Sequence, residues 1–334
     1  MICYIQINST NKAKNDIDRL MHDALYKDLA IKGIGSGKVE TFCRKLFSVA
    51  NLLIKLKRND VLIIQYPFKK FYATYCRIAK LKHARTITLI HDLGTFRRKK
   101  LSAKEEISRL SRSDYIIAHN EKMKMWLTEN GCKCRIGCLK IFDYLSDYQN
   151  QNEEHHRPYN RIAYAGGLYK RKNAFLYDAG KAIEGCVLDL YGKGDLDTNL
   201  MGENIKVHGR IDSDSFIENV DDDWGLIWDG DTVNGCNGTW GNYLRYNNPH
   251  KTSFYLRAGL PVIVWKESAV APFILEHNIG IAVDSLNEIP SVIKDLTEDE
   301  YTQKLDNTQR IKTQLQEGTY LYKALKDAMH TLNS

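Results

Sequence analysis

A helix start rich in polar residues stands within the stretch NNPHKTSFYLRAGLPVIVW. Asn248 suits the N-cap of this helix, and Pro249 suits its first turn, where a missing N–H group costs nothing. The backbone N–H groups of His250, Lys251 and Thr252 would then point outward at the positive end of the helix dipole. Because Lys251 adds a full charge, the pattern is typical of an anion site. The alternative is a capped helix whose apolar face packs on a sheet.

Two glycines and three cations follow an expected strand in the stretch YAGGLYKRKN. Gly166 and Gly167 lack side chains, so the backbone can approach a ligand closely. The cations that follow are Lys170, Arg171 and Lys172. This order suits a diphosphate, whereas the G-x-G-x-x-G fingerprint of dinucleotide sites is missing. The alternative is a solvated basic turn.

A histidine and an aspartate end the apolar run of TLIHDLGTF. An expected strand delivers His91 and Asp92 to its carboxyl end. A proton acceptor beside a charged partner at such a place is what general base catalysis needs. The alternative is a structural histidine at the end of the strand.

Two further groups of residues are weak candidates for metal binding. Asp229 and Asp231 follow a strand and could hold a divalent ion, but the preceding sequence is acidic as well, with Asp at 221–223. The eight cysteines are scattered, and the cluster GCKCRIGC lacks the C-x2-C spacing of zinc sites. We therefore expect no metal.

Short apolar runs alternate with helical patterns along the chain. Expected strands occupy 2–8, 60–67, 84–92, 114–120, 161–167, 187–194, 204–211, 224–230, 259–265 and 280–284. Expected helices occupy 14–29, 71–83, 103–113, 121–131, 173–183, 213–220, 249–258 and 270–277. The closing segment is helical in pattern, with a break near Gly318. This alternation predicts parallel sheets covered by helices on both faces.

A polar segment at 146–160 divides the pattern into two α/β domains. We expect a Rossmann-like domain at 1–150, a second at 151–312, and a C-terminal helix at 313–334 that packs back on the first. Open α/β sheets bind ligands beyond the carboxyl ends of their strands, so we expect the site in a cleft between the domains.

Charge differs strongly between the two halves. Residues 1–150 contain 29 Lys and Arg against 14 Asp and Glu, and the remainder contains 19 against 27. A basic half indicates nucleic acid, an anionic membrane face, or merely a basic surface. We expect no nucleic-acid partner, because the strands are continuous apolar runs, typical of strands buried on both faces.

Five motifs resemble a known family of glycosyltransferases. LIHDL, KIFDYL, YAGGLYKRKNAF, WGLIWDGD and NNPHKTSFYLRAGLPVIVW are similar to segments of bacterial O-antigen β-1,6-galactofuranosyltransferases, which have the GT-B fold of two Rossmann-like domains facing across a cleft. A more distant resemblance is to streptococcal adhesin glucosyltransferases. The resemblance implies transfer of galactofuranose from UDP-galactofuranose to a glycan of O-antigen or capsule, by a β-1,6 linkage with inversion. A glucosyl- or galactosyltransferase, or a non-catalytic glycan-binding partner, stays as the alternative.

The resemblance also implies roles for residues that bind the donor. Lys170 and Lys251 would hold the diphosphate, with Arg171 or Lys172 able to share it. The uridine would be bordered by Tyr191, Gly209 and Arg210. A UDP-sugar is then the co-substrate, and no further cofactor is expected.

Inversion requires a base that deprotonates the acceptor hydroxyl. Asp92 and His91 are the candidates, and either could act while the other orients it. Lys251 and Lys170 would stabilise the departing UDP. Lys12 and Lys14, at the opening of the first expected helix, would complete the cleft from the other side.

The acceptors of this family imply a membrane surface. They are lipid-linked or polysaccharide glycans, so the resemblance implies a protein that is peripheral on the inner membrane face. The first residues, MICYIQINST, lack the basic start and the long apolar segment of a signal peptide, so we expect a cytoplasmic protein. A homo-oligomer is left open. The segment 68–83 mixes Phe71, Tyr72 and Tyr75 with cations that include Lys69 and Lys70, which suits that interface. The alternative is an ordinary surface helix with a tyrosine-rich core face.

Overall fold

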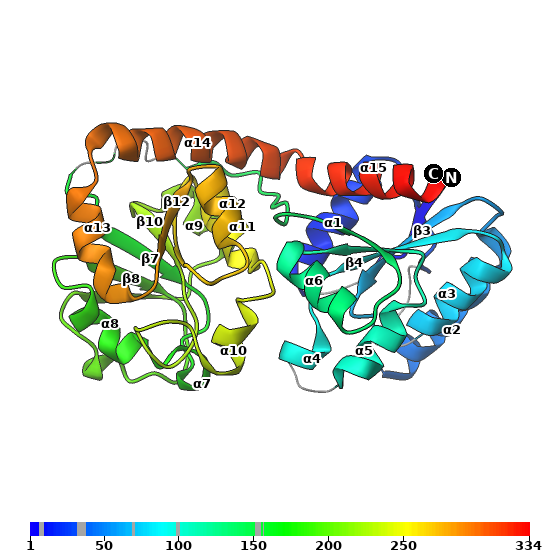
Figure 1. Ribbon diagram of the computed structural model, residues 1–334, viewed down its shortest axis with the longest axis horizontal. Coiled ribbons are helices and arrows are strands. Elements are labelled where there is room, and N and C mark those ends of the chain that lie inside the picture. The colour runs from blue at the N-terminus through cyan, green and yellow to red at the C-terminus, as the bar shows by residue number, and fades with distance from the viewer. Residues whose placement is uncertain (7–9, 32–37, 69–70, 98–100, 151–154, 156) are drawn as a thin grey trace. The chain divides into compact units, whose positions relative to one another are not determined.

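The chain folds into two units, seen in a computed structural model (Figure 1). The structure describes residues 1–6, 10–31, 38–68, 71–97, 101–150, 155 and 157–334. Unit 1 comprises Met1–Leu139 and Leu321–Ser334, and unit 2 comprises Lys140–Tyr320. Lys69 and Lys70 lie outside the described residues. Within the described part, every helix is too short or too polar to cross a bilayer.

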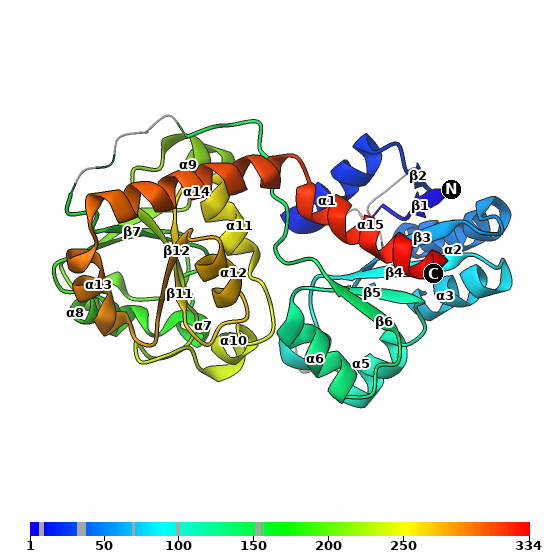
Figure 2. The same cartoon turned by 45° about the horizontal axis from the view of Figure 1, so that its top comes forward.

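Unit 1 is built on a parallel six-stranded sheet with the order β2-β1-β3-β4-β5-β6. Its strands are β1 (Ile2–Tyr4), β2 (Lys27–Asp28), β3 (Val61–Tyr66), β4 (Arg85–Ile90), β5 (Tyr115–Ala118) and β6 (Arg135–Cys138). Its helices are α1 (Lys12–Asp23), α2 (Lys38–Lys55), α3 (Tyr72–Leu81), α4 (Gly94–Arg97), α5 (Ala103–Leu110), α6 (Glu121–Glu129) and most of α15 (Thr319–Asn333). Figure 2 shows α15 beside α1, and the Tyr322 hydroxyl donates to the Leu20 carbonyl at 2.9 Å.

Unit 2 repeats the plan with the order β12-β11-β10-β7-β8-β9. Its strands are β7 (Arg161–Ala165), β8 (Val187–Tyr191), β9 (Ile205–Gly209), β10 (Trp224–Ile227), β11 (Val262–Trp265) and β12 (Gly280–Val283). Its helices are α7 (Lys170–Asn173), α8 (Leu176–Ala182), α9 (Ser213–Asn219), α10 (Gly238–Tyr243), α11 (His250–Arg257), α12 (Ala271–Glu276), α13 (Ile289–Asp295) and α14 (Glu298–Gln316), with 3-10 turns η1 (Thr198–Leu200) and η2 (Leu286–Glu288). Counted within the unit, this is the doubly wound order 3-2-1-4-5-6.

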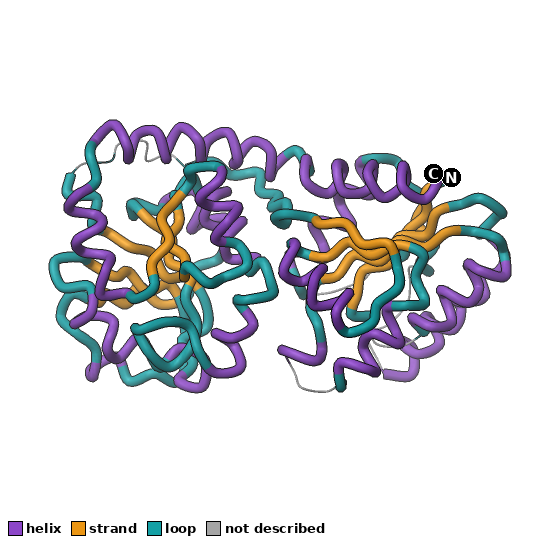
Figure 3. Tube along the Cα trace, in the orientation of Figure 1, coloured by secondary structure: helices purple, strands orange, loops and turns teal. Residues whose placement is uncertain are grey.

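Each sheet lies between helices, and its central strands are buried on both faces (Figure 3). The strand order reverses between β1 and β3 in unit 1 and between β7 and β10 in unit 2. The helices that follow such strands depart to opposite faces, which leaves a crevice at the carboxyl ends. These two reversal points are where the pockets described below lie.

The structure contains elements that the sequence did not predict, among them β6, α4, α10 and α13, and three further differences follow. The first helix ends at Asp23 rather than near residue 29, because Leu25 takes a positive φ of 58° and the chain then forms β2. Helix α2 was not anticipated. In the segment 68–83, Tyr72 and Tyr75 are buried in the core, so the expectation that they face a membrane is wrong and the core-face alternative is right.

Candidate active site

A pocket of about 500 Å³ lies at the carboxyl ends of the unit 2 strands. We call it the C-terminal pocket. Its walls come from the loops that follow β7, β8 and β9, and from the start of α11. The residues that line it are Tyr144, Ala165, Gly166, Gly167, Tyr169, Tyr191, Gly192, Lys193, Arg210, Ile211, Ser213, His250, Lys251 and Phe254.

Two loops of this pocket pack backbone against backbone. Gly166 has a φ of 147°, and a Cβ atom placed on Gly192 would stand 1.8 Å from the Gly166 carbonyl oxygen. Side chains are therefore excluded where the loops after β7 and β8 meet. Gly192 was not identified from the sequence. Its signal is the stretch YGKG at 191–194, in which glycines follow an expected strand as they do in YAGG at 164–167.

Lys251, in the first turn of α11, is one of the cations that line the C-terminal pocket. Its Nζ lies 3.7 Å from the centroid of the Tyr164 ring. Burial lowers the pKa of Lys251 to about 7, Asp229 opposes that shift, and Lys172 adds to it. Asp229 is itself paired with Lys172 at 3.2 Å, so its charge is largely compensated. Lys251 is thus a partly desolvated ammonium group that a bound anion would stabilise.

The run of three cations at 170–172 does not line the pocket. The Lys170 side chain is exposed, and its backbone N–H donates to the Asp195 carboxylate at 2.7 Å. Arg171 lies over the Tyr169 ring, 5.9 Å from its centroid. Lys172 holds Asp229. In their place the structure presents Lys193, an exposed lysine after β8 that sequence reasoning missed.

The Asp229 carboxylate has protein partners rather than an arrangement suited to a metal. Besides Lys172 it accepts a hydrogen bond from the Tyr164 hydroxyl at 3.4 Å. Across the described ranges, no three His, Cys, Asp or Glu side chains gather as metal ligands would.

A buried polar network supports Tyr191 on the pocket wall. The Tyr191 ring stacks on His208, with centroids 4.7 Å apart, and its hydroxyl donates to Asp222 at 2.9 Å. Burial, and then the charge of Asp189, raise the pKa of Asp222 to about 8. Burial alone would raise the pKa of Asp189, but hydrogen bonds from His208 and Asp222 lower it. The protonated form of Asp222 is therefore favoured beside an ionised Asp189.

Arg210 also lines this wall and stands directly after Gly209, whose φ of 76° turns the chain at the end of β9. The aromatic ring of Tyr191 and the guanidinium of Arg210 are thus both presented to the pocket. They can contact a planar base and its attached phosphates.

Helix α11 begins one residue later than expected. Pro249 is the N-cap and Asn248 precedes it, with its side-chain amide donating to the Lys140 carbonyl at 2.5 Å. The prediction that Asn248 caps the helix is therefore wrong, because its amide is used to hold an adjoining segment. The Thr252 N–H donates to the Pro249 carbonyl at 2.9 Å, so this group does not face a ligand. His250 lines the pocket and stacks on Tyr144, with centroids 4.8 Å apart.

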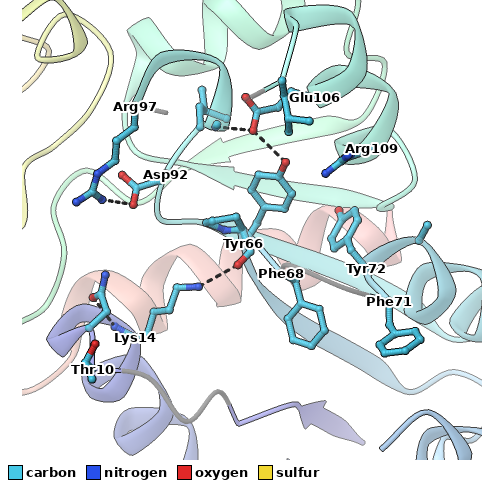
Figure 4. A pocket seen from close by; sticks show the side chains of 16 residues that line it. Thr10, Lys14, Tyr66, Phe68, Phe71, Tyr72, Asp92, Arg97, Glu106 and Arg109 are labelled. Carbon is cyan, nitrogen blue, oxygen red and sulfur yellow. Dashed lines mark hydrogen bonds and ion pairs between the residues drawn. The ribbon is translucent and has the colours of Figure 1, made fainter. Parts of the chain in front are cut away.

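A second pocket, of about 660 Å³, lies in unit 1 (Figure 4). We call it the N-terminal pocket. An aromatic wall stands opposite charged side chains, among them Asp92, Arg97 and Lys14. The residues that line it are Thr10, Asn11, Lys14, Tyr66, Pro67, Phe68, Phe71, Tyr72, Ala73, Asp92, Leu93, Gly94, Arg97, Leu101, Glu106 and Arg109.

The structure separates the two candidate bases. Asp92 lines the N-terminal pocket and forms an ion pair with Arg97 (Figure 4). His91 is buried and does not line the pocket, and its Nε2 lies 2.7 Å from the Gln65 Oε1. Of the two candidate bases, Asp92 is the one that can contact a molecule in this pocket.

The two lysines of α1 have different surroundings. Lys14 is buried, lines the N-terminal pocket, and donates from Nζ to the Pro67 carbonyl at 3.1 Å. Lys12 pairs with Asp16 of the same helix at 2.6 Å. Of the two, Lys14 is the residue that a ligand in this pocket can contact.

Glu106, which sequence reasoning missed, fixes the loop that carries Asp92. Its buried carboxylate accepts hydrogen bonds from the Gly94 N–H at 2.7 Å, the Thr95 N–H at 2.8 Å and the Tyr66 hydroxyl at 2.9 Å. A carboxylate among three donors ties α5, the end of β3 and the loop after β4 together (Figure 4).

Comparison with known proteins assigns both units to one family. The model of the glucosyltransferase 3-like N-terminal domain matches residues 4–141, and that of the glucosyltransferase 3-like C-terminal domain matches residues 162–328. Beta-1,6-galactofuranosyltransferase WbbI of Escherichia coli (strain K12) is 31% identical over 328 residues, covering 97% of this chain and 95% of that protein. Glucosyltransferase 3 of Streptococcus gordonii is 24% identical, covering 95% and 93%.

Solved structures show the same fold at low sequence identity. A glycosyltransferase from Rickettsia africae aligns with a TM-score of 0.57 at 10% identity, covering 99% of this chain and 98% of that one. The lipopolysaccharide outer core galactosyltransferase WaaB aligns with a TM-score of 0.51 at 13% identity, covering 93% and 99%. The resemblance seen in the five sequence motifs is confirmed. The chain belongs to the glucosyltransferase 3-like family and is a glycosyltransferase with the GT-B fold.

Proposed function

We propose that the protein transfers galactofuranose from UDP-galactofuranose to a glycan acceptor of a cell-surface polysaccharide, forming a β-1,6 linkage with inversion. The 31% identity to a β-1,6-galactofuranosyltransferase over almost the whole chain supports the donor and linkage. The observation that carries the proposal is the position of Lys251, a half-buried lysine at a helix N-terminus in a glycine-walled pocket.

The C-terminal pocket is proposed to bind the UDP part of the donor. Lys251 and the first turn of α11 would contact the diphosphate, because both present positive charge there. Gly166 and Gly167 would let the backbone approach the phosphates. Tyr191 and Arg210 would border the uridine. Lys170, Arg171 and Lys172 would act through the local potential rather than by lining the site.

Transfer would be a single displacement at the anomeric carbon. Asp92 takes the proton of the acceptor hydroxyl, that oxygen forms a bond to the anomeric carbon, and the bond from this carbon to the UDP oxygen breaks. The negative charge that develops on UDP is stabilised by Lys251, so no metal is required. His91 is assigned a structural role beside Gln65, with Asp92 as the base.

The acceptor is proposed to be a lipid-linked or polysaccharide glycan that enters the N-terminal pocket, at the inner face of the cell membrane. Aromatic side chains such as Tyr66 and Phe68 offer apolar faces on which sugar rings can stack. The basic balance of residues 1–150 favours an anionic surface nearby.

A glucosyltransferase acting on a glycoprotein glycan is the second candidate, favoured by the 24% identity to glucosyltransferase 3 of Streptococcus gordonii. Separate incubations with UDP-galactofuranose, UDP-galactose and UDP-glucose, followed by product analysis, decide between the two. Turnover with UDP-glucose alone would reject the galactofuranose assignment.

UDP binding is tested by thermal unfolding. We expect UDP to raise the melting temperature without added metal, and turnover to survive EDTA. An unchanged melting temperature at millimolar UDP would contradict the assignment of the C-terminal pocket. Turnover lost in EDTA and restored by a divalent ion would contradict the metal-free mechanism.

A further inference from the structure

Helix α2 of unit 1 exposes large apolar side chains to solvent. Phe42 is 45% exposed, Leu46 50%, Phe47 61%, Leu53 43% and Ile54 79%. Single exposed apolar residues are common on protein surfaces, but five on one helix form a patch that usually marks an interaction site.

These five side chains share one face of α2. Successive residues of an α-helix are rotated by about 100°, which places them within an arc of about 140°. Cys43 and Ala50 fall within the same arc and are also exposed, so among the α2 side chains that the structure describes no charged residue interrupts it. The opposite side is anchored in the core through Leu52, which is fully buried. The helix is therefore fixed to the domain with an apolar face turned outward, and we call this face the α2 strip.

The α2 strip is continuous with the N-terminal pocket. Phe42 contacts Phe71, with ring centroids 6.2 Å apart, and Phe71 lines the pocket together with Phe68. Helices α2 and α3 pack side by side in both views (Figures 1 and 2). An apolar path thus leads from the exposed helix to the wall opposite Asp92 (Figure 4).

Exposed cations flank the α2 strip. Lys55 ends the helix, and Lys57 and Arg58 follow after the buried Leu56. Arg77 and Lys80 are exposed on α3, the helix packed against α2. Apolar side chains bordered by lysine and arginine are the composition of helices that lie in the interface of anionic membranes.

We propose that the α2 strip docks on an anionic lipid surface, with its apolar side chains inserted at the headgroup boundary and the flanking cations on the lipid phosphates. A second copy of the chain is a poorer occupant, because two such rims of lysine and arginine would repel each other. The docking element is α2, not the tyrosines of segment 68–83, which are in the core. The further step, that a lipid-carried acceptor reaches the pocket along this path, rests on the proposed function.

The test is flotation of the full-length protein with two kinds of vesicle, one of phosphatidylglycerol and phosphatidylcholine in equal parts and one of phosphatidylcholine alone. We expect binding to the anionic vesicles, weakened by salt. A variant with Leu46→Gln, Phe47→Gln and Ile54→Gln should lose affinity by on the order of a hundredfold or more, because three large apolar side chains no longer enter the interface. A matched control with Leu25→Gln and Met125→Gln, which replaces exposed apolar residues elsewhere in unit 1, should bind as the wild type.

Three results would overturn the docking proposal. One is no binding of the wild type to anionic vesicles, and another is equal binding by the α2 variant. The third concerns the oligomeric state, measured by light scattering. If the wild type is a dimer, and the α2 substitutions convert it to a monomer without changing vesicle binding, the α2 strip contacts a second copy of the chain and not a lipid surface. The thermal shift with UDP, measured on the same preparations, reports the C-terminal pocket separately. If UDP does not raise the melting temperature while vesicle binding is intact, the donor assignment is rejected and the docking proposal is unaffected.

Discussion

Removing the charge of Lys251 should abolish a pH dependence of donor binding. With a pKa of about 7 in the empty pocket, the lysine is about nine-tenths protonated at pH 6 and about one-tenth at pH 8. A bound diphosphate raises this pKa, because opposite charges within a few ångströms favour the charged form. Above pH 7 the lysine of the empty pocket is mostly neutral and must take up a proton when the donor binds. The affinity for the donor therefore falls as pH rises. The expected loss from pH 6 to pH 8 is about tenfold, or about 1.4 kcal/mol.

Calorimetric titration with a UDP-sugar measures this loss. A UDP-sugar is preferable to UDP, since a terminal phosphate itself titrates near pH 6. At pH 7, titrations in two buffers of different ionisation enthalpy should show uptake of about half a proton per ligand. Lys251→Met should bind weakly at pH 6 and show no further loss at pH 8. The control Lys193→Met removes an exposed lysine of the same pocket and should weaken binding without changing the slope.

A slope that persists in Lys251→Met would refute this reasoning. Asp222, whose pKa is about 8, lies behind Tyr191 and would be the next group to examine, because its ionisation also disfavours an anionic ligand. A wild-type affinity that does not change between pH 6 and pH 8 would likewise show that Lys251 does not gain a proton on binding.

Three other substitutions test separate parts of the site. Asp92→Asn should lower kcat by roughly 10²–10⁴-fold, the usual worth of a general base, while UDP binding stays unchanged; a kcat within threefold or so of the wild type would reject Asp92 as the base. Asp222→Asn mimics the protonated carboxyl. The pKa of Asp222 is near 4 in the unfolded chain and about 8 in the folded one, so between these values the folded wild type binds a proton that the unfolded chain does not. The wild type therefore loses stability as pH rises through this window. In urea unfolding, the stability of the variant relative to the wild type should increase from pH 5 to pH 8. An identical pH profile of the two proteins would contradict the raised pKa. Glu106→Gln places an amide N–H₂ against at least one donor and should cost roughly 1–3 kcal/mol of unfolding free energy, with a lower kcat because the Asp92 loop is loosened. Unchanged stability and kcat would show that this carboxylate does not fix the loop.

The sequence predicted the central strands of both sheets because they are buried on two faces, which leaves continuous apolar runs such as Val61–Tyr66, whereas the short edge strands β2 and β6 were missed. Helix α2 was overlooked although its apolar residues, among them Phe42, Leu46 and Leu53, recur at helical spacing; what the sequence does not show is that this apolar face is exposed rather than buried. The same property makes it a docking candidate.

The residues expected in the site line a pocket where backbone geometry decides their position, and face elsewhere where side-chain partners decide it. Gly166 and Lys251 line the C-terminal pocket because a strand end and a helix start fix their positions. The cations at 170–172 face elsewhere, since Lys172 is drawn to Asp229, a residue far away in the sequence. Asn248 is engaged by Lys140 for the same reason. Sequence spacing contains no information about such distant partners.

The acidic half of the chain can hold an anionic donor because the carboxylates around its pocket are compensated one by one. Asp229 is paired with Lys172, Asp189 accepts from His208 and Arg161, and Asp222 is held in its protonated form. Lys251 has no carboxylate within ion-pair distance among the residues that the structure describes, so the local potential is set by this lysine, by Lys193 and Arg210 of the same pocket, and by the start of α11. Net charge over a domain governs encounters at long range, whereas the compensation of individual side chains governs what a desolvated pocket can bind. The excess of 27 Asp and Glu over 19 Lys and Arg in residues 151–334 is therefore compatible with a diphosphate site.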